Sequence, residues 1–283
     1  NTAKKTVLAN GVTILTKVNP SSDIVAFRLF LQAGPRYEKP NENGLSNMML
    51  RLLQAGTKTR SLQEIAEAVD SIGADFNTDL NKDFGGLVLK TTRATFDQGL
   101  EILLDCLLNS NFPEDRFLNE QETILREIRQ ERDNILPETF RLFQQEIYQD
   151  HPYAQPALGT EETVSAFSRD DVIRYYENCL DPDRMLVVAV GNFDSDALIG
   201  RMKETLGRLP DQAEHGERAL DGTLLPLPTD HRVLIEERES EAEWMVLGYL
   251  APAAGSADFA AMKVIDSIMG GSMNSRLFNE LRE

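Results

Sequence analysis

Apolar and polar residues follow two different periods along this chain, which predicts both strands and helices. Short apolar runs flank Asn10-Gly11, a pair typical of a two-residue hairpin turn, and predict two antiparallel strands within residues 6–15. Gly34-Pro35 is expected to end the strand that follows. Runs rich in β-branched, leucine and aromatic residues predict the remaining strands, at about 24–32, 74–78, 85–91 and 184–190.

Apolar residues that recur every three or four positions predict helices between and after these strands. Ser61, followed by Glu64 three residues later, forms a capping box that is expected to start one helix, and Gly73 is expected to end it. The other predicted helices cover residues 43–54, 95–108, 113–134, 137–149, 163–178 and 194 to about 207.

The helix predicted over 43–54 has two unlike faces. One face carries core residues at helical spacing, namely Leu45, Met48, Met49, Leu52 and Leu53. The other face carries Asn47, Leu50, Arg51 and Gln54, and Leu50 is the apolar exception there. On the residues alone, this second face is a helix surface of mixed polarity with no site.

The order of elements is typical of an α+β fold, here a ferredoxin-like or split α/β lobe with a mostly antiparallel sheet and helices on one face. We expect residues 1–210 to form one complete lobe. Residues 211–230, which contain prolines and charges with little periodicity, are expected to form a linker.

Residues 231–283 are expected to start a second, similar lobe. Strands are predicted at 232–236 and 244–250, followed by a helix over 259–269 and another that opens near 274. Two strands with one and a half helices do not close a core. We therefore expect this lobe to be truncated, with roughly another hundred residues in a longer natural chain.

Composition narrows the function classes. Of the 283 residues, 41% are hydrophobic and 27% are charged, as in ordinary globular proteins. The formal net charge of -17 argues against nucleic acid and anionic membranes as partners, and weakly favours basic partners or peptides. The alternative is that the charge has no partner and only keeps the protein soluble. No apolar run approaches the roughly 20 residues of a membrane helix.

The two cysteines and the amino-terminal residues say little about the compartment. Cys106 and Cys179 lie in apolar helical patterns and are expected to be buried thiols. The first residues are polar and contain no signal-peptide core. The compartment stays open, with a bacterial periplasmic or cytoplasmic setting expected first and a mitochondrial one also compatible.

An ordered series of short motifs carries a family resemblance. The motifs include Asn10-Gly11-Val12, Gly34-Pro35-Arg36-Tyr37-Glu38, Gly44-Leu45-Ser46, Ala55-Gly56-Thr57, His151-Pro152-Tyr153, Val188-Ala189-Val190-Gly191-Asn192 and Ser275-Arg276-Leu277-Phe278. Their succession resembles the insulinase/pitrilysin-type zinc metallopeptidases, or inverted zincins, which include the mitochondrial processing peptidases. The resemblance covers nearly the whole chain, as one lobe and the beginning of another.

The resemblance implies a place for a zinc site. In this family a helix carries H-x-x-E-H, in which the two histidines bind zinc and the glutamate activates the metal-bound water. The matching positions here are Asn47, Leu50 and Arg51. A second helix of the family supplies a glutamate ligand that follows another glutamate with six residues between them, and Glu120 and Glu127 have this spacing.

The resemblance therefore implies a degenerate site that retains one ligand position of three, at Glu127. A catalytic zinc site needs about three protein ligands and a water. Zinc is expected in active relatives, and we predict none here. We predict instead that Arg51 and Glu127 form an ion pair at the former metal position. On the residues alone, Glu120, Glu127 and Glu131 also fit a solvated acidic stripe.

Other candidate residues give less specific indications of function. Arg282 matches an arginine with which active relatives hold substrate, so it is a candidate substrate-binding residue. His151, His215 and His231 are scattered and do not have the spacing of a zinc site. Gly270-Gly271 lies where inactive lobes of the family carry a longer glycine-rich segment.

We expect a non-catalytic homologue, subunit or domain of a zinc metallopeptidase, inactive as a protease by itself. It would bind a peptide or unfolded protein segment opposite an active lobe that carries H-x-x-E-H, on the same polypeptide or another. Two alternatives remain: a structural scaffold without peptide chemistry, as in the core subunits of the cytochrome bc complex, and an independent metallopeptidase with unusual ligands.

Overall fold

The fold is that of a computed structural model, which describes residues 2–210, 232–238 and 243–282. For residue 282 this description covers the backbone alone. Six strands form one sheet: β1 (Lys4–Val7), β2 (Thr13–Val18), β3 (Ile24–Leu31), β4 (Asp75–Leu80), β5 (Gly85–Thr92) and β6 (Leu186–Gly191). Their order is β1-β2-β6-β3-β5-β4. All neighbouring strands are antiparallel except β2 and β6, which are parallel. The predicted, mostly antiparallel sheet is confirmed.

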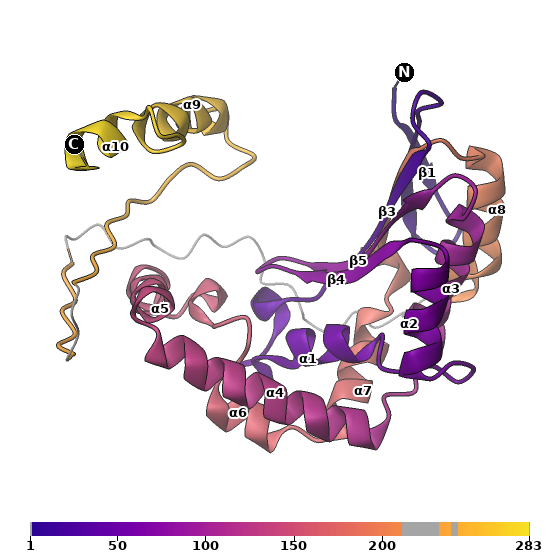
Figure 1. The fold of residues 1–283 in the computed structure, drawn as a ribbon, viewed down its shortest axis with the longest axis horizontal. Coiled ribbons are helices and arrows are strands. Elements are labelled where there is room, and N and C mark those ends of the chain that lie inside the picture. The colour runs from indigo at the N-terminus through magenta and orange to yellow at the C-terminus, as the bar shows by residue number, and fades with distance from the viewer. Residues whose placement is uncertain (1, 211–231, 239–242, 283) are drawn as a thin grey trace.

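Ten α-helices accompany the sheet in the described residues (Figure 1). They are α1 (Leu45–Leu52), α2 (Leu62–Ser71), α3 (Phe96–Asn109), α4 (Glu114–Asp133), α5 (Ile135–Tyr148), α6 (Glu161–Ala166), α7 (Arg169–Cys179), α8 (Ser195–Glu204), α9 (Phe259–Met269) and α10 (Arg276–Arg282). None of the described helices is long and apolar enough to cross a membrane.

Local signals determine several of these boundaries. Gly11 has a φ of 95°, and a Cβ there would lie 1.5 Å from Asp183 Oδ1, so the turn between β1 and β2 requires glycine. The predicted capping box is present, because Ser61 accepts a hydrogen bond from the Glu64 N–H and the Glu64 side chain binds back to Ser61.

The helix predicted over 163–178 is wrong as a single element. Phe167 has an extended backbone, and α6 ends before it. Ser168 then starts α7 as its N-cap, with Asp171 completing a second capping box. The physical reason for the break is that the Ser168 side chain satisfies the first N–H groups of a new helix rather than lying inside an old one.

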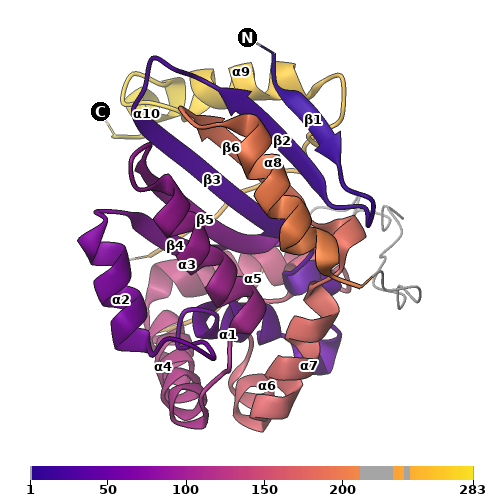
Figure 2. The same ribbon diagram turned by 90° about the vertical axis from the view of Figure 1, so that its right-hand side faces the viewer.

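One face of the sheet is buried by helices. Val25, Phe27, Leu29 and Leu31 alternate along β3, and each is at most 1% exposed. Helices α3 and α8 lie across this face (Figure 2). Thr16 Oγ1 and Ser195 Oγ are 3.1 Å apart and join β2 to α8. The predicted helix layer on one face is confirmed.

Helix α1 lies between the edge strand β4 and helix α4, in contact with both. The buried carboxylate of Glu38 caps its amino end by accepting hydrogen bonds from the N–H groups of Gly44 and Ser46 at 2.9 and 2.7 Å. Burial raises the pKa of Glu38, against the opposing effect of these hydrogen bonds. The cap fixes where α1 begins, and hence where its side chains lie.

The part after residue 231 differs from expectation in its strands. Residues 232–238 and 243–250 form no strand in the described structure, although helix α9 spans the predicted 259–269. A strand needs a backbone partner, and these segments have none among the described residues; Val233 and Ile235 are 70 and 78% exposed. The predicted linker at 211–230 lies outside the described residues.

Both cysteines are buried thiols, as predicted.

Candidate functional site

The second face of α1 places Asn47, Leu50 and Arg51 toward different surroundings. Leu50 is 2% exposed, and its Cδ1 would lie 2.5 Å from a Cβ on Gly85, so it packs directly against the start of β5. Asn47 is 9% exposed, and the Arg51 side chain is 28% exposed. The apolar residue of this face therefore belongs to the core, and the two polar residues form the site.

Arg51 connects α1 to α4 through a network of hydrogen bonds. Its Nη1 donates to Glu120 Oε1 and to Glu127 Oε1, each at 3.0 Å, and its Nη2 donates to Glu127 Oε2 at 2.6 Å. Its Nε donates to Asn47 Oδ1 at 3.1 Å, one turn back along α1. The ion pair predicted between Arg51 and Glu127 is present, and Glu120 joins it.

The spacing of the two glutamates explains why one arginine reaches both. Seven residues are nearly two helical turns, so Glu120 and Glu127 project from the same face of α4. The Glu127 hydrogen bond is the main cause that raises the pKa of Arg51, so the guanidinium is charged at all ordinary pH values. Partial burial, with Glu127 and Glu138 nearby, raises the pKa of Glu131 one turn further along.

Comparisons with known proteins give the family. A profile of the insulinase family, peptidase family M16, matches residues 13–161, and the profile of the peptidase M16 inactive domain matches residues 166–283. The chain belongs to peptidase family M16. It is 30% identical over 281 residues to an uncharacterized zinc protease of Bacillus subtilis, YmxG, covering 99% of this chain and 67% of the relative.

Further relatives of the M16 chain support the same family assignment. An uncharacterized zinc protease of Rickettsia felis is 29% identical, covering 98% of this chain and 66% of the relative. Among solved structures, a protease from Helicobacter pylori superimposes with a TM-score of 0.88 at 22% identity, covering 99% of this chain and 68% of that one. This likeness shows the fold alone. The M16 chain thus spans about two thirds of the length of these curated relatives.

The zinc ion that the family implies does not fit the residues present. Asn47 offers an amide, Leu50 offers no donor atom, and Arg51 carries a fixed positive charge into the space beside Glu127. Within the described ranges, no group of three or more His, Cys, Asp or Glu side chains is placed to hold a metal ion. A catalytic zinc needs about three such ligands.

Of the remaining candidate residues of the M16 chain, His151 makes contacts within its own loop. His151 packs against the ring of Tyr153 at 4.6 Å, and its Nδ1 accepts from the Tyr153 N–H, so it stabilises its own loop. His215, His231 and the side chain of Arg282 lie outside the described residues. Gly270 is the C-cap of α9.

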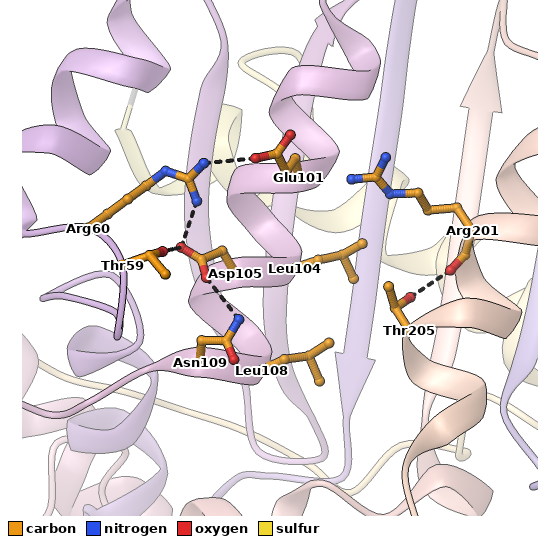
Figure 3. A pocket seen from close by; sticks show the side chains of 9 residues that line it. All are labelled: Thr59, Arg60, Glu101, Leu104, Asp105, Leu108, Asn109, Arg201 and Thr205. Atoms are coloured by element: carbon orange, nitrogen blue, oxygen red, sulfur yellow. Dashed lines mark hydrogen bonds and ion pairs between the residues drawn. The ribbon is translucent and has the colours of Figure 1, made fainter.

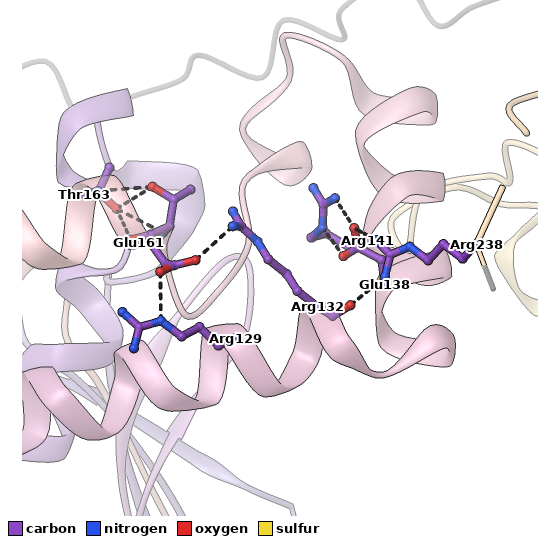
Figure 4. A network of polar contacts seen from close by, with 8 residues as sticks. Arg129, Arg132, Glu138, Arg141, Glu161, Thr163 and Arg238 are labelled. Carbon is purple, nitrogen blue, oxygen red and sulfur yellow. Dashed lines mark hydrogen bonds and ion pairs between the residues drawn. The ribbon is translucent and has the colours of Figure 1, made fainter. Parts of the chain in front are cut away.

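The M16 chain holds a second arginine–carboxylate network that the sequence analysis missed. Glu138 is 6% exposed, and Arg141 donates to its two carboxylate oxygens at 2.6 and 2.5 Å (Figure 4). Arg238, from beyond the predicted linker, reaches Glu138 at 3.3 Å and the Arg132 carbonyl at 2.7 Å. The i, i+3 spacing of Glu138 and Arg141 was a signal for the pair, but not for its burial.

A cavity of about 500 Å³ opens between α3 and α8 of the M16 chain and shares no residue with the Arg51 network (Figure 3). The Asp105 carboxylate in its wall already has hydrogen-bond donors. Asp105 accepts from Arg60, Thr57 and Asn109 at 2.7, 2.8 and 2.9 Å. Burial alone would raise the pKa of Asp105, but these hydrogen bonds, with that of Asn109 the largest, hold it below its ordinary value.

Proposed function

We propose that this M16 chain is a non-catalytic peptidase lobe that holds an extended peptide opposite an active lobe carrying H-x-x-E-H. The single observation that carries the proposal is the Arg51 guanidinium, bound between Glu120 and Glu127 at 2.6–3.0 Å. In the arrangement that the family resemblance implies, a metal ion would lie beside Glu127. A guanidinium there repels a cation and takes up the carboxylate oxygens that would bind it.

This arrangement does not supply the nucleophile and the general base that hydrolysis in the family uses. The family's nucleophile is a metal-bound water, and its general base is the glutamate at the position of Leu50. Leu50 is buried and apolar, so it accepts no proton. Loss of a general base alone costs on the order of 10²–10⁴ in rate, and loss of the metal removes the activated water as well.

Peptide binding is supported by the edge of the sheet beside this site. Strand β4 ends the strand order, and no described strand pairs with its outer edge. Its N–H and C=O groups there can add an extended peptide as a further strand. Asp75, Asn77 and Asp79 alternate with Phe76, which is 8% exposed, and so project from the opposite face of β4. Asp79 is already paired with Arg28, so the charge of Asp75 and the net charge of -17 are what favour peptides with basic residues.

The proposed partner is an active lobe that carries H-x-x-E-H. Because the chain spans about two thirds of its curated relatives, an active lobe can lie on the same polypeptide or on another one. We take residues 1–210 as the peptide-holding lobe and residues 231–283 as the start of the next.

The test combines three measurements on the full chain. Fluorescently labelled β-casein, an unfolded protein, should bind without being cleaved, and zinc analysis should find far less than one zinc per chain. Stoichiometric zinc with EDTA-sensitive cleavage would overturn the proposal. Failure to bind β-casein or its fragments, with the chain folded, would favour a structural scaffold instead.

A further inference from the structure

The amide of Asn47 uses only one of its two ends in the Arg51 network. Its Oδ1 accepts the hydrogen bond from Arg51 Nε at 3.1 Å. A reversed amide would place its NH₂ group against this N–H donor, so the contact with Arg51 fixes the orientation. The Nδ2 atom is buried, and no hydrogen-bond acceptor is placed for it among the described residues.

Buried polar groups in folded proteins are nearly always paired, so an unpaired one indicates a ligand or an ordered water that satisfies it. The position of Asn47 makes this observation specific. It precedes Arg51 by one turn on α1, the helix that contacts the edge strand β4. The donor therefore lies on the helix beside the strand to which the proposed function assigns peptide binding.

The charge around Asn47 restricts what its Nδ2 can bind. Arg51 carries one positive charge, and the two carboxylates, Glu120 and Glu127, carry one negative charge each. The network therefore has a net charge of -1. Glu131 adds a further carboxylate near Glu127. A carboxylate or phosphate ligand would be repelled there, whereas a neutral carbonyl oxygen accepts the hydrogen bond without adding charge.

We propose that Asn47 Nδ2 binds a main-chain carbonyl oxygen of the peptide that lies along β4, an inference that rests on the proposed function. Nδ2 is enclosed in the peptide-free chain, so the carbonyl reaches it when the side chains around Nδ2 move aside. The side chains of Arg51, Glu120 and Glu127 are 28, 27 and 37% exposed, so the network already borders solvent. The amide then holds a peptide carbonyl without a metal ion.

The test is a carbonyl scan of one peptide against matched variants. The probe is the twelve-residue β-casein fragment that binds the wild-type chain most tightly. Each of its peptide bonds in turn is made a thioamide, which keeps the N–H and weakens the acceptor. The variants are Asn47→Asp, which keeps the acceptor for Arg51 but has no donor, Asn47→Ala, and the control Asn119→Ala, at an exposed position of α4.

With the wild-type chain and with Asn119→Ala, one thioamide position should weaken binding by about 3- to 10-fold, as loss of one neutral hydrogen bond predicts. With both Asn47 variants, the peptide that carries the thioamide at that position should bind no more weakly than the parent peptide does. Asn47→Asp keeps the test open if Asn47→Ala does not fold.

Two outcomes overturn the inference alone: no sensitive position in the wild-type chain, or the same sensitivity in the Asn47 variants. A crystal structure of the complex with water, rather than peptide, on Nδ2 would also overturn it. If no β-casein fragment binds the folded wild-type chain, the proposed function itself has failed, and the inference fails with it.

Discussion

Arg51 and Glu127 form a two-bond ion pair, with Nη1–Oε1 at 3.0 Å and Nη2–Oε2 at 2.6 Å. The pair joins α1 to α4, and the same guanidinium also binds Glu120 and the amide of Asn47. A planar guanidinium matches a carboxylate in this way, and a lysine at this position would supply a single point of charge.

Removing Arg51 should destabilise the chain because it leaves two carboxylates facing each other without a cation. We expect Arg51→Met to lower the free energy of unfolding by about 1–3 kcal/mol at pH 7. Urea unfolding at pH 7 measures the loss.

The matched control is Arg126→Met, at an exposed position on the same α4 helix. Its effect should stay within about 0.5 kcal/mol, as for most surface substitutions. Equal losses for Arg51→Met and Arg126→Met would show that the network adds nothing to stability.

Glu131 should destabilise the chain at neutral pH. Partial burial and the charges of Glu127 and Glu138 raise its pKa in the folded chain. The folded state therefore keeps the proton to a higher pH than the unfolded state does, so stability is lost as pH rises through the raised pKa. Glu131→Gln should unfold at higher urea than wild type at pH 7 and at the same urea below pH 4.

Glu122→Gln, on an exposed part of α4, is the control for this pH series. As an exposed substitution, it should change the free energy of unfolding by no more than about 0.5 kcal/mol at pH 7. If Glu131→Gln changes stability at pH 7 as little as Glu122→Gln does, the Glu131 carboxyl does not destabilise the folded chain.

The parts of this structure that were predictable rest on local signals. Asn10-Gly11 fixes a hairpin, and Ser61 with Glu64 caps a helix, because each uses neighbours in sequence. The signal for the break before α7, Ser168 with Asp171, was equally local and was overlooked. The parallel pairing of β2 with β6 joins residues far apart in the chain, and no local pattern reports it.

The contact between Arg51 and Glu127 was predictable, but the full geometry of the Arg51 network was not. Periodicity placed Asn47 and Arg51 on one face, and the spacing of Glu120 and Glu127 placed them on another helix. That the two faces meet followed from the family resemblance, not from composition. The unpaired Nδ2 of Asn47 and the burial of Glu138 depend on how neighbouring helices pack, which the sequence alone does not report.

Glu138 should stabilise the chain at neutral pH. Hydrogen bonds from Arg141, with further charge from Arg238 and Arg132, hold the pKa of this carboxyl below its ordinary value. Its stabilisation is therefore present above the pKa of the unfolded chain and is lost as pH falls through the folded value. We expect Glu138→Gln to lower the free energy of unfolding by about 1–3 kcal/mol at pH 7, and by less near pH 3.

The contact with Arg238 can be separated from the contact with Arg141 by a double-mutant cycle. Arg238→Gln should cost less than Glu138→Gln, because Arg238 is 38% exposed and approaches Glu138 at 3.3 Å. In the Glu138→Gln background, Arg238→Gln should cost less than it does in the wild-type chain. Independent, additive losses would show that Glu138 and Arg238 do not interact.

Restoring the family motif should create a zinc site if α1 and α4 keep the peptidase frame. Asn47→His, Leu50→Glu and Arg51→His together remove the guanidinium and place two imidazoles one turn apart, beside Glu127. Histidines at this spacing and one glutamate make the three-ligand set of catalytic zinc sites. We expect about one zinc per chain by metal analysis, and a rise in the thermal unfolding midpoint when zinc is added.

Two variants check the origin of that zinc binding. Adding Glu127→Gln to the triple variant should weaken zinc binding by about 10-fold or more, since it removes the third ligand. Leu50→Glu alone should be strongly destabilised and gain nothing from zinc, because it buries a carboxylate against Gly85 with Arg51 still in place. A folded triple variant that takes up no zinc would mean that the face of α1 carrying Asn47 and Arg51 does not correspond to the metal-binding face of the active relatives.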